Sequence, residues 1–138
     1  MADARLVVVT GASSSIGADT ARALVRDAGS VEGFAAWTEG LGGASVLVNN
    51  AGGAKGLEPI AEMDEGRWRW MYEANVLGLA MMTKALLPQV RRPGNGRVVI
   101  IGSAAGTETY VKETYVKGAG YTAAKFGAHA VFGSLRLA

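Results

Sequence analysis

The chain opens with Leu6-Val-Val-Val-Thr-Gly-Ala-Ser-Ser-Ser-Ile-Gly17, a β-branched run that leads into a turn rich in glycine and serine. The run Leu6–Val9 predicts a short, fully buried strand, and apolar or small residues then recur at helical spacing from Ile16 to about Ala28. A strand that delivers such a turn to a helix N-terminus makes an anion site, because free backbone N–H groups and the helix dipole face the phosphate. An ordinary strand-to-helix turn is the alternative, and this motif alone does not decide between them.

Strands and helices alternate along the rest of the chain. The first helix should end at Gly29, and the further expected elements are a helix over Val31–Leu41 stopped by Gly42-Gly43, a strand at Val46–Val48, a long helix from the N-cap Asp64 to Pro93-Gly94, a strand at Arg97–Ile101 and a helix from Ala119 onward. This order predicts an α/β, Rossmann-like fold. It would form a single domain over residues 1–138, with a shortened parallel sheet of about three recognisable strands flanked by helices.

Composition excludes several classes of function. The net charge is only +2 and the basic residues are scattered, so we expect no nucleic-acid partner. Without cysteine and with His129 as the single histidine, we expect no metal site. No stretch approaches the roughly 20 apolar residues of a membrane span, and we expect a cytoplasmic protein with no membrane partner.

Tyr121 and Lys125 stand four residues apart in the last predicted helix. Side chains at this spacing share one helical face, about 5–6 Å apart at Cβ. An ammonium group at that distance would favour the ionised form of the tyrosine, which is what a tyrosine needs to act as an acid/base. The alternative is an unrelated exposed pair; Tyr110 and Tyr115, by contrast, have no lysine four residues later.

Four further positions lie where residues of a site are expected. Gly11, Asn50 and Ser103 each follow a predicted strand, and ligands of α/β sheets bind outside the carboxyl ends of the strands. Asn75 is a polar residue on the apolar stripe of the long helix, where a structural hydrogen bond is the strong alternative to a chemical role.

Taken in order, these segments resemble the short-chain dehydrogenase/reductase family over nearly the whole chain. That family has a Gly-rich turn, an Asn-Asn-Ala-Gly turn, a helical Asn, a Ser after the next strand and a Tyr-x-x-x-Lys pair. The counterparts here are Thr10–Gly17, Asn49–Gly52, Asn75, Ser103 and Tyr121–Lys125.

The resemblance implies an enzyme, an NAD(P)-dependent oxidoreductase that transfers hydride between a nicotinamide cofactor and a small carbonyl or alcohol substrate. Tyr121 would be the acid/base, Lys125 would assist it and bind the nicotinamide ribose, Ser103 would hold the substrate oxygen, and Asn75 would anchor a water in the proton relay. The implied cofactor-binding residues are Gly11, Ser13, Ser14, Ser15, Ile16, Gly17, Asn50, Ala51, Gly52, Tyr121 and Lys125. In the family the long helix and the catalytic helix pack against a second subunit, so we expect a homo-oligomer.

The chain also departs from the family pattern. Ser15 replaces the middle glycine of the turn, and the space between Gly29 and Val46 has room for one helix where the family has two strands and two helices. That missing part carries the residue that distinguishes NAD from NADP, so the sequence favours neither cofactor. The chain ends near the catalytic helix, and Glu108–Lys112 is repeated at once as Glu113–Lys117. A non-catalytic remnant or fragment, serving as a dinucleotide-binding or oligomerisation module, is therefore the alternative function.

The shortening has a consequence for topology. With the intermediate strands missing, the first strand should cross directly to Val46–Val48, and such crossovers are right-handed. The first strand would then be an open edge of the sheet.

Overall fold

Three parallel strands form the sheet of the computed structural model, which describes residues 5–11, 28–107 and 118–135. The strands β1 (Leu6–Val9), β2 (Ala44–Asn49) and β3 (Arg97–Ile100) lie in the order β1-β2-β3. Val8 is opposite Leu47, and Leu47 is opposite Val98. The α/β class and the predicted strands are confirmed, and β1 is an edge strand as expected.

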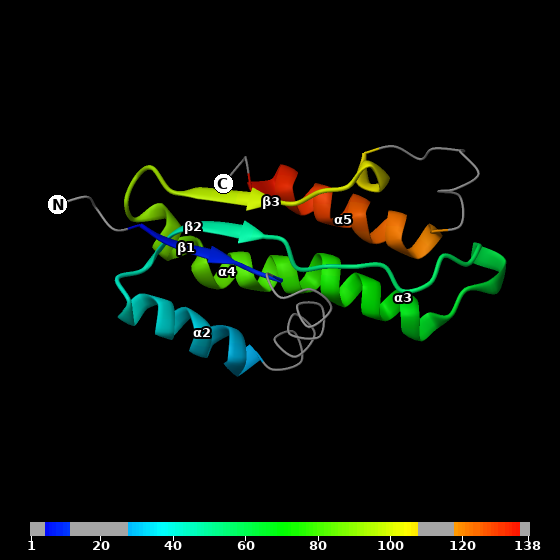
Figure 1. The fold of residues 1–138 in the computed structure, drawn as a ribbon, viewed down its shortest axis with the longest axis horizontal. Helices are drawn as coiled ribbons and strands as arrows, with labels where there is room; N and C mark the ends of the chain where they lie inside the picture. The colour runs from blue at the N-terminus through cyan, green and yellow to red at the C-terminus, as the bar shows by residue number, and fades with distance from the viewer. Residues whose placement is uncertain (1–4, 12–27, 108–117, 136–138) are drawn as a thin grey trace.

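The helices follow the predicted alternation (Figure 1). They are α2 (Ala28–Gly40), α3 (Glu65–Tyr72), a π-helical segment (Glu73–Leu77), α4 (Gly78–Arg91) and α5 (Ala119–Leu135), with short 3₁₀ turns at Ile60–Glu62 and Ala104–Gly106. None of the described helices is long and apolar enough to span a membrane.

The boundaries of α2 correct one prediction. Gly29 lies in the first turn of α2, because a glycine ends a helix only when its backbone turns left-handed, and here it continues helically. The predicted stop at Gly42 and Gly43 is confirmed, since these two residues have φ of 104° and 84°. Residues 16–27 of the predicted first helix and the repeat at 108–117 lie outside the described residues.

The long predicted helix begins where expected but is interrupted. Asp64 caps α3, with its Oδ1 accepting a hydrogen bond from the backbone N–H of Arg67 at 2.8 Å. Between α3 and α4 the chain widens into the π-helical segment, which holds Asn75. Such widened turns occur often at functional sites, and the spacing of apolar residues gave no sign of this one.

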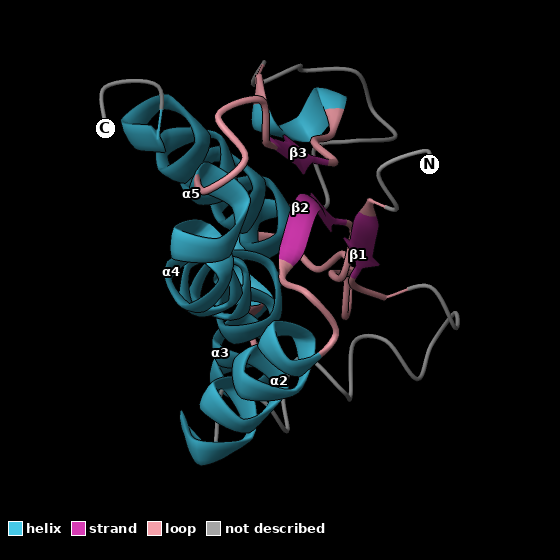
Figure 2. Cartoon of the chain, turned by 90° about the vertical axis from the view of Figure 1, so that its left-hand side faces the viewer, coloured by secondary structure: helices cyan, strands magenta, loops and turns pink. Residues whose placement is uncertain are grey.

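The helices α2, α3, α4 and α5 lie on one face of the sheet (Figure 2). Both crossovers move in the same direction across the sheet, from β1 to β2 and from β2 to β3, so the right-handed rule places α2 and α4 on the same side. The core between this face and the helices consists of buried Val8, Ala44, Leu47, Met82, Leu86 and Val90, with Phe34, Ala35 and Val98 packed against it.

The opposite face of the sheet is exposed within the described residues, which corrects the expectation of fully buried strands. Val7 and Val9 on β1 are 50% and 46% exposed, and Val99 on β3 is 41% exposed. They belong to two rows that cross the sheet, Val7–Val46–Arg97 and Val9–Val48–Val99. The β-branched runs predicted the strands correctly, but burial on both faces needs helices on both sides.

A second core lies under α5. Buried Trp70, Met71, Ala74, Val76 and Ala124 form it, with Trp68, Tyr121 and Val131 packed against it. The buried stripe of α5 runs through Gly120, Ala124 and Ala128. Phe132 is 37% exposed, whereas a Cβ on Gly120 would lie 2.5 Å from Met71 Cε, so small residues are the ones that allow α5 to approach α3 closely.

Candidate active site

The residues that follow the three strands meet at one edge of the sheet, because all strand arrows point the same way (Figure 1). Gly11, Asn50 and Ser103 therefore lie at the carboxyl edge, as predicted. The ladder continues past the strand ends: the Thr10 N–H donates to Val48 O at 3.0 Å, and the Ile101 N–H donates to Asn49 O at 2.9 Å. These bonds hold the three loops in register.

Thr10 and Gly11 lock the end of β1 to the turn after β2. The Thr10 hydroxyl accepts hydrogen bonds from the backbone N–H groups of Asn50 and Ala51, each at 3.1 Å, and Asn50 Nδ2 donates to Gly11 O at 3.3 Å. Gly11 has φ of 69°, and a Cβ built on it would lie 2.7 Å from Ala51 Cα. Only glycine fits here. Ser13, Ser14, Ser15, Ile16 and Gly17 lie outside the described residues.

Asn75 forms hydrogen bonds with Gly53, which belongs to the same turn after β2. Its Oδ1 accepts from the Gly53 N–H at 3.2 Å, and its Nδ2 donates to Gly53 O and to Met71 O, both at 2.8 Å. Asn75 is buried, and a Cβ on Gly52 would lie 2.5 Å from its Oδ1. The structural hydrogen bond considered as the alternative for Asn75 is thus present. Both protons of the Asn75 side-chain amide are therefore engaged within the protein, and its Oδ1 already accepts one hydrogen bond.

Tyr121 and Lys125 lie in the first half of α5. The Lys125 Nζ is 5.7 Å from the centroid of the Tyr121 ring and donates a long hydrogen bond of 3.5 Å to Ile101 O, at the end of β3. A Cβ on Gly52 would lie 3.7 Å from the same nitrogen. Burial lowers the pKa of Lys125. The ammonium group is therefore held between the β3 loop and the β2 turn.

Ser103 lies directly before the 3₁₀ turn Ala104–Gly106, and this turn determines its position. Its Oγ accepts from the Ala105 N–H at 3.2 Å, which caps the turn Ala104–Gly106. A Cβ on Gly106 would lie 2.7 Å from Lys125 O, so the turn packs directly on α5. Ser103 is consequently fixed on the side of β3 where Lys125 lies.

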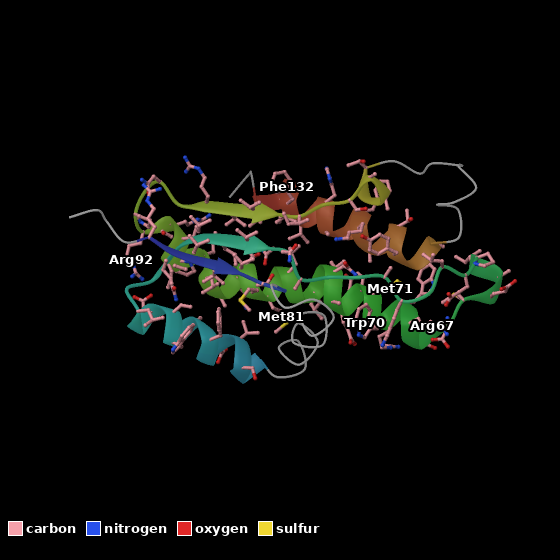
Figure 3. The ribbon with its side chains drawn as sticks, in the orientation of Figure 1. Arg67, Trp70, Met71, Met81, Arg92 and Phe132 are labelled. Carbon is pink, nitrogen blue, oxygen red and sulfur yellow. The ribbon has the colours of Figure 1, made fainter. Side chains whose placement is uncertain are left out.

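The structure thus gathers Gly52, Asn75, Ser103, Tyr121 and Lys125 from four segments. Sequence reasoning missed Trp70, which lies outside the predicted stripe of the long helix, and Gly53, on which its ring packs: a Cβ on Gly53 would lie 3.4 Å from Trp70 Cη2. The pair of glycines Gly52-Gly53 was the available signal, because paired glycines after a strand often mark a close approach. Figure 3 shows Trp70 and Met71 at this end of the molecule.

The polar groups of Lys125, Tyr121 and Ser103 can all donate hydrogen bonds. An ammonium group, a tyrosine hydroxyl and a serine hydroxyl can hold a substrate oxygen and move a proton. Gly11 and Gly52 allow close internal packing at this edge, Gly11 against Ala51 and Gly52 against Asn75 and Lys125. Within residues 5–11, 28–107 and 118–135, no group of acidic residues and histidine is placed to hold a metal ion.

Comparison with known proteins points to one family. The short chain dehydrogenase family matches residues 28–138. An oxidoreductase of Mycobacterium tuberculosis H37Rv is 39% identical, over 96% of this chain and 62% of its own length. The alignment spans 164 residues against the 138 of this chain, so the relative carries residues inside the matched stretch that this chain lacks. A stretch of 65 residues, 47% of this chain, is 42% identical to 26% of an NADP-dependent 3-hydroxy acid dehydrogenase of Escherichia coli K12.

Solved structures share the arrangement of strands and helices. Serine dehydrogenase from Escherichia coli has a TM-score of 0.78 at 27% identity, over 95% of this chain and 74% of that one. The actinorhodin polyketide ketoreductase, solved with NADPH, has a TM-score of 0.75 at 27% identity, over 96% of this chain and 64% of that one.

Proposed function

Because the chain belongs to the short chain dehydrogenase family, we propose that it is an NAD(P)-dependent oxidoreductase that interconverts a carbonyl and an alcohol, with Tyr121 as the acid/base. The observation that carries this proposal is the position of Lys125. Its ammonium group lies beside the Tyr121 ring, at the end of β3 and next to Gly52. An unrelated exposed pair would not be fixed by two strand ends at the edge where ligands bind.

The carboxyl edge fits the nicotinamide half of a dinucleotide. Gly11 and Gly52 leave no room for a side chain, while Asn50 and Lys125 present donors to ribose and phosphate oxygens. Ser13, Ser14, Ser15, Ile16 and Gly17 would complete the phosphate-binding turn. When bound, a nicotinamide cofactor would supply or accept the hydride.

Tyr121, Ser103 and Lys125 would divide the proton chemistry between them. In reduction, the Tyr121 hydroxyl donates its proton to the carbonyl oxygen, and in oxidation the tyrosinate accepts the proton of the alcohol. Ser103 Oγ holds the same oxygen. Lys125 places a positive charge beside Tyr121, with its Nζ 5.7 Å from the ring centroid. Asn75 holds Gly53 and thereby fixes the turn that faces Lys125.

The comparisons support a nicotinamide cofactor without deciding which one. The ketoreductase was solved with NADPH and the hydroxy acid dehydrogenase is NADP-dependent. Residues that would select NADP over NAD belong to the stretch that this chain lacks, so the proposal covers both cofactors and a small carbonyl or alcohol substrate. A homo-oligomer built through α4 and α5 is part of the proposal, and light scattering that shows a clean monomer would remove that part.

Substitution of Tyr121 tests the proposal. We expect Tyr121→Phe to lower turnover of a carbonyl substrate by roughly a hundredfold or more, because acid/base catalysis contributes that much, while binding of NADPH stays largely intact. Tyr72→Phe, at an exposed tyrosine on α3, is the matched control and should keep full turnover. Equal turnover in wild type and Tyr121→Phe would overturn the proposal. An absence of both turnover and cofactor binding in the wild type would favour the non-catalytic remnant.

A further inference from the structure

The first turn of α5 packs on α3 at the residue that precedes Tyr121. Gly120 is buried, and a Cβ built on it would lie 2.5 Å from Met71 Cε and 3.0 Å from Cε2 and Nε1 of the Trp68 ring. A side chain at position 120 would therefore overlap with atoms of α3. The absence of a side chain on Gly120 determines how closely the start of α5 approaches α3.

Met71 has little space in which to move away from residue 120. Its side chain is 2% exposed and belongs to the apolar cluster that also contains Trp70 and Ala124. Tyr121 packs against the same cluster. A methionine can change its rotamer, but a close-packed interior leaves few empty directions for it. A methyl group added at Gly120 would thus displace the first turn of α5, which carries Tyr121.

The backbone of Met71 connects this contact to the turn after β2. Its carbonyl oxygen accepts a hydrogen bond of 2.8 Å from Asn75 Nδ2, and the same amide nitrogen donates at 2.8 Å to Gly53 O. Asn75 lies in the π-helical segment that directly follows α3. Met71 thus contacts the start of α5 with its side chain and is linked through Asn75 to the turn that faces the active site.

The part of α5 that carries Lys125 is held by different contacts. A Cβ on Gly106 would lie 2.7 Å from Lys125 O, and Lys125 Nζ donates to Ile101 O at 3.5 Å. Both contacts come from the segment after β3, whereas the contact at Gly120 comes from α3. A change at Gly120 should therefore displace Tyr121 more than Lys125.

We propose that Met71 is a positioning residue for Tyr121. Its buried side chain, packed under Gly120, determines where the Tyr121 ring lies relative to Ser103 and the carboxyl edge of the sheet. Proton transfer depends on this position, because a displacement of about 1 Å can lower a rate roughly a hundredfold. The effect on turnover rests on the proposed function, whereas the position of Tyr121 can be measured without turnover.

Substitutions of two glycines of α5 test the effect on turnover. Gly133→Ala is the matched control, because Gly133 is exposed and a Cβ added there would meet nothing within 4 Å. We expect Gly120→Ala to lower kcat for a carbonyl substrate roughly tenfold or more, while KM for NADPH changes little and Gly133→Ala keeps full kcat. The double variant Gly120→Ala with Met71→Leu should recover most of the loss, because leucine lacks the terminal methyl group that the alanine would meet.

Fluorine NMR of protein labelled with 3-fluorotyrosine follows Tyr121 without substrate. The chain has four tyrosines, and Tyr121→Phe identifies the resonance of Tyr121. We expect this resonance to move in Gly120→Ala, to return toward its wild-type position in the double variant and to stay in place in Gly133→Ala. If Gly120→Ala does not fold, Met71→Leu alone removes the same contact at nearly constant volume and should also move the resonance.

The outcomes separate the role of Met71 from the proposed function. A resonance that does not move in Gly120→Ala would overturn the assignment, and so would a shift that persists in the double variant, because the new methyl group alone would then explain it. Unchanged kcat in a variant whose resonance moves would also overturn it. The expected shifts in a wild-type background without turnover would support the role of Met71 and contradict the oxidoreductase.

Discussion

Gly11 carries the closest approach between the two strand-end loops. Its φ of 69° disfavours any side chain, and a Cβ would meet Ala51 Cα at 2.7 Å. We expect Gly11→Ala to lower the free energy of unfolding by at least about 1–2 kcal/mol, the cost of the left-handed backbone alone. Gly33→Ala is the control, because Gly33 lies inside α2 with open space around it and should gain up to about 1 kcal/mol. Urea denaturation that gave both variants the same stability would contradict this account of the turn.

Partial burial makes the charged form of Lys125 costly for the fold. Burial lowers its pKa below the ordinary value of 10.5, so between the lowered pKa and 10.5 the unfolded chain binds more protons than the folded chain. The free energy of unfolding should therefore rise with pH through that window. We expect Lys125→Met to abolish turnover and to remove this rise, while Lys84→Met keeps it. Thermal melts across the alkaline range measure the effect, and an unchanged slope in Lys125→Met would contradict it.

Gln89 joins three elements through one buried side chain. On α4, its Oε1 accepts from Thr38 Oγ1 at 3.0 Å and from the Ala44 N–H at 2.9 Å, and its Nε2 donates to Ala35 O at 2.7 Å. Gln89→Leu would leave the Ala44 N–H buried without its acceptor, whereas the Thr38 hydroxyl keeps its hydrogen bond to Ala35 O at 2.9 Å. We expect a loss of about 2–3 kcal/mol in urea denaturation. Lys84→Ala, exposed on the same helix, should stay within about 0.5 kcal/mol, and equal losses in the two variants would argue against the link.

At the scale of elements, the sequence predicted what local patterns determine. The β-branched runs located the strands, the paired glycines located the end of α2, and Asp64 located the start of α3. The π-helical segment could not be predicted, because it depends on how Asn75 and its neighbours pack on Gly53 and α5. Polar residues such as Gln89 read as surface positions in sequence, and only the helix pairing shows them to be buried.

The whole molecule covers one face of its sheet with helices and leaves the other exposed within the described residues. Val8 and Val9 are adjacent on β1 and test this directly, since they are 7% and 46% exposed. Val8→Thr should cost about 1–2 kcal/mol because it buries a hydroxyl in the core, whereas Val9→Thr should stay within about 0.5 kcal/mol. Denaturation that finds Val9→Thr as costly as Val8→Thr would show that this face is covered in solution.

The sequence predicted only those parts of the site that follow from the sheet topology and from the spacing of residues along a helix. A parallel sheet brings Gly11, Asn50 and Ser103 to one edge, and four-residue spacing puts Tyr121 and Lys125 on one face of α5, so those positions could be predicted. Contacts that depend on the packing of α3 and α5 could not, and these include the approach of Trp70 to Gly53 and the hold of Asn75 on the turn. The exposed sheet face escaped prediction for the same reason.

The central claim is that the carboxyl edge binds a nicotinamide dinucleotide although the chain lacks residues that a relative carries within the matched stretch. Calorimetric titration with NADPH and NADH, side by side, tests it most directly. The account predicts binding of at least one of them with a Kd on the order of micromolar, and a marked loss of that binding in Gly11→Ala. No binding of either dinucleotide at millimolar concentration by a folded wild-type protein would contradict it.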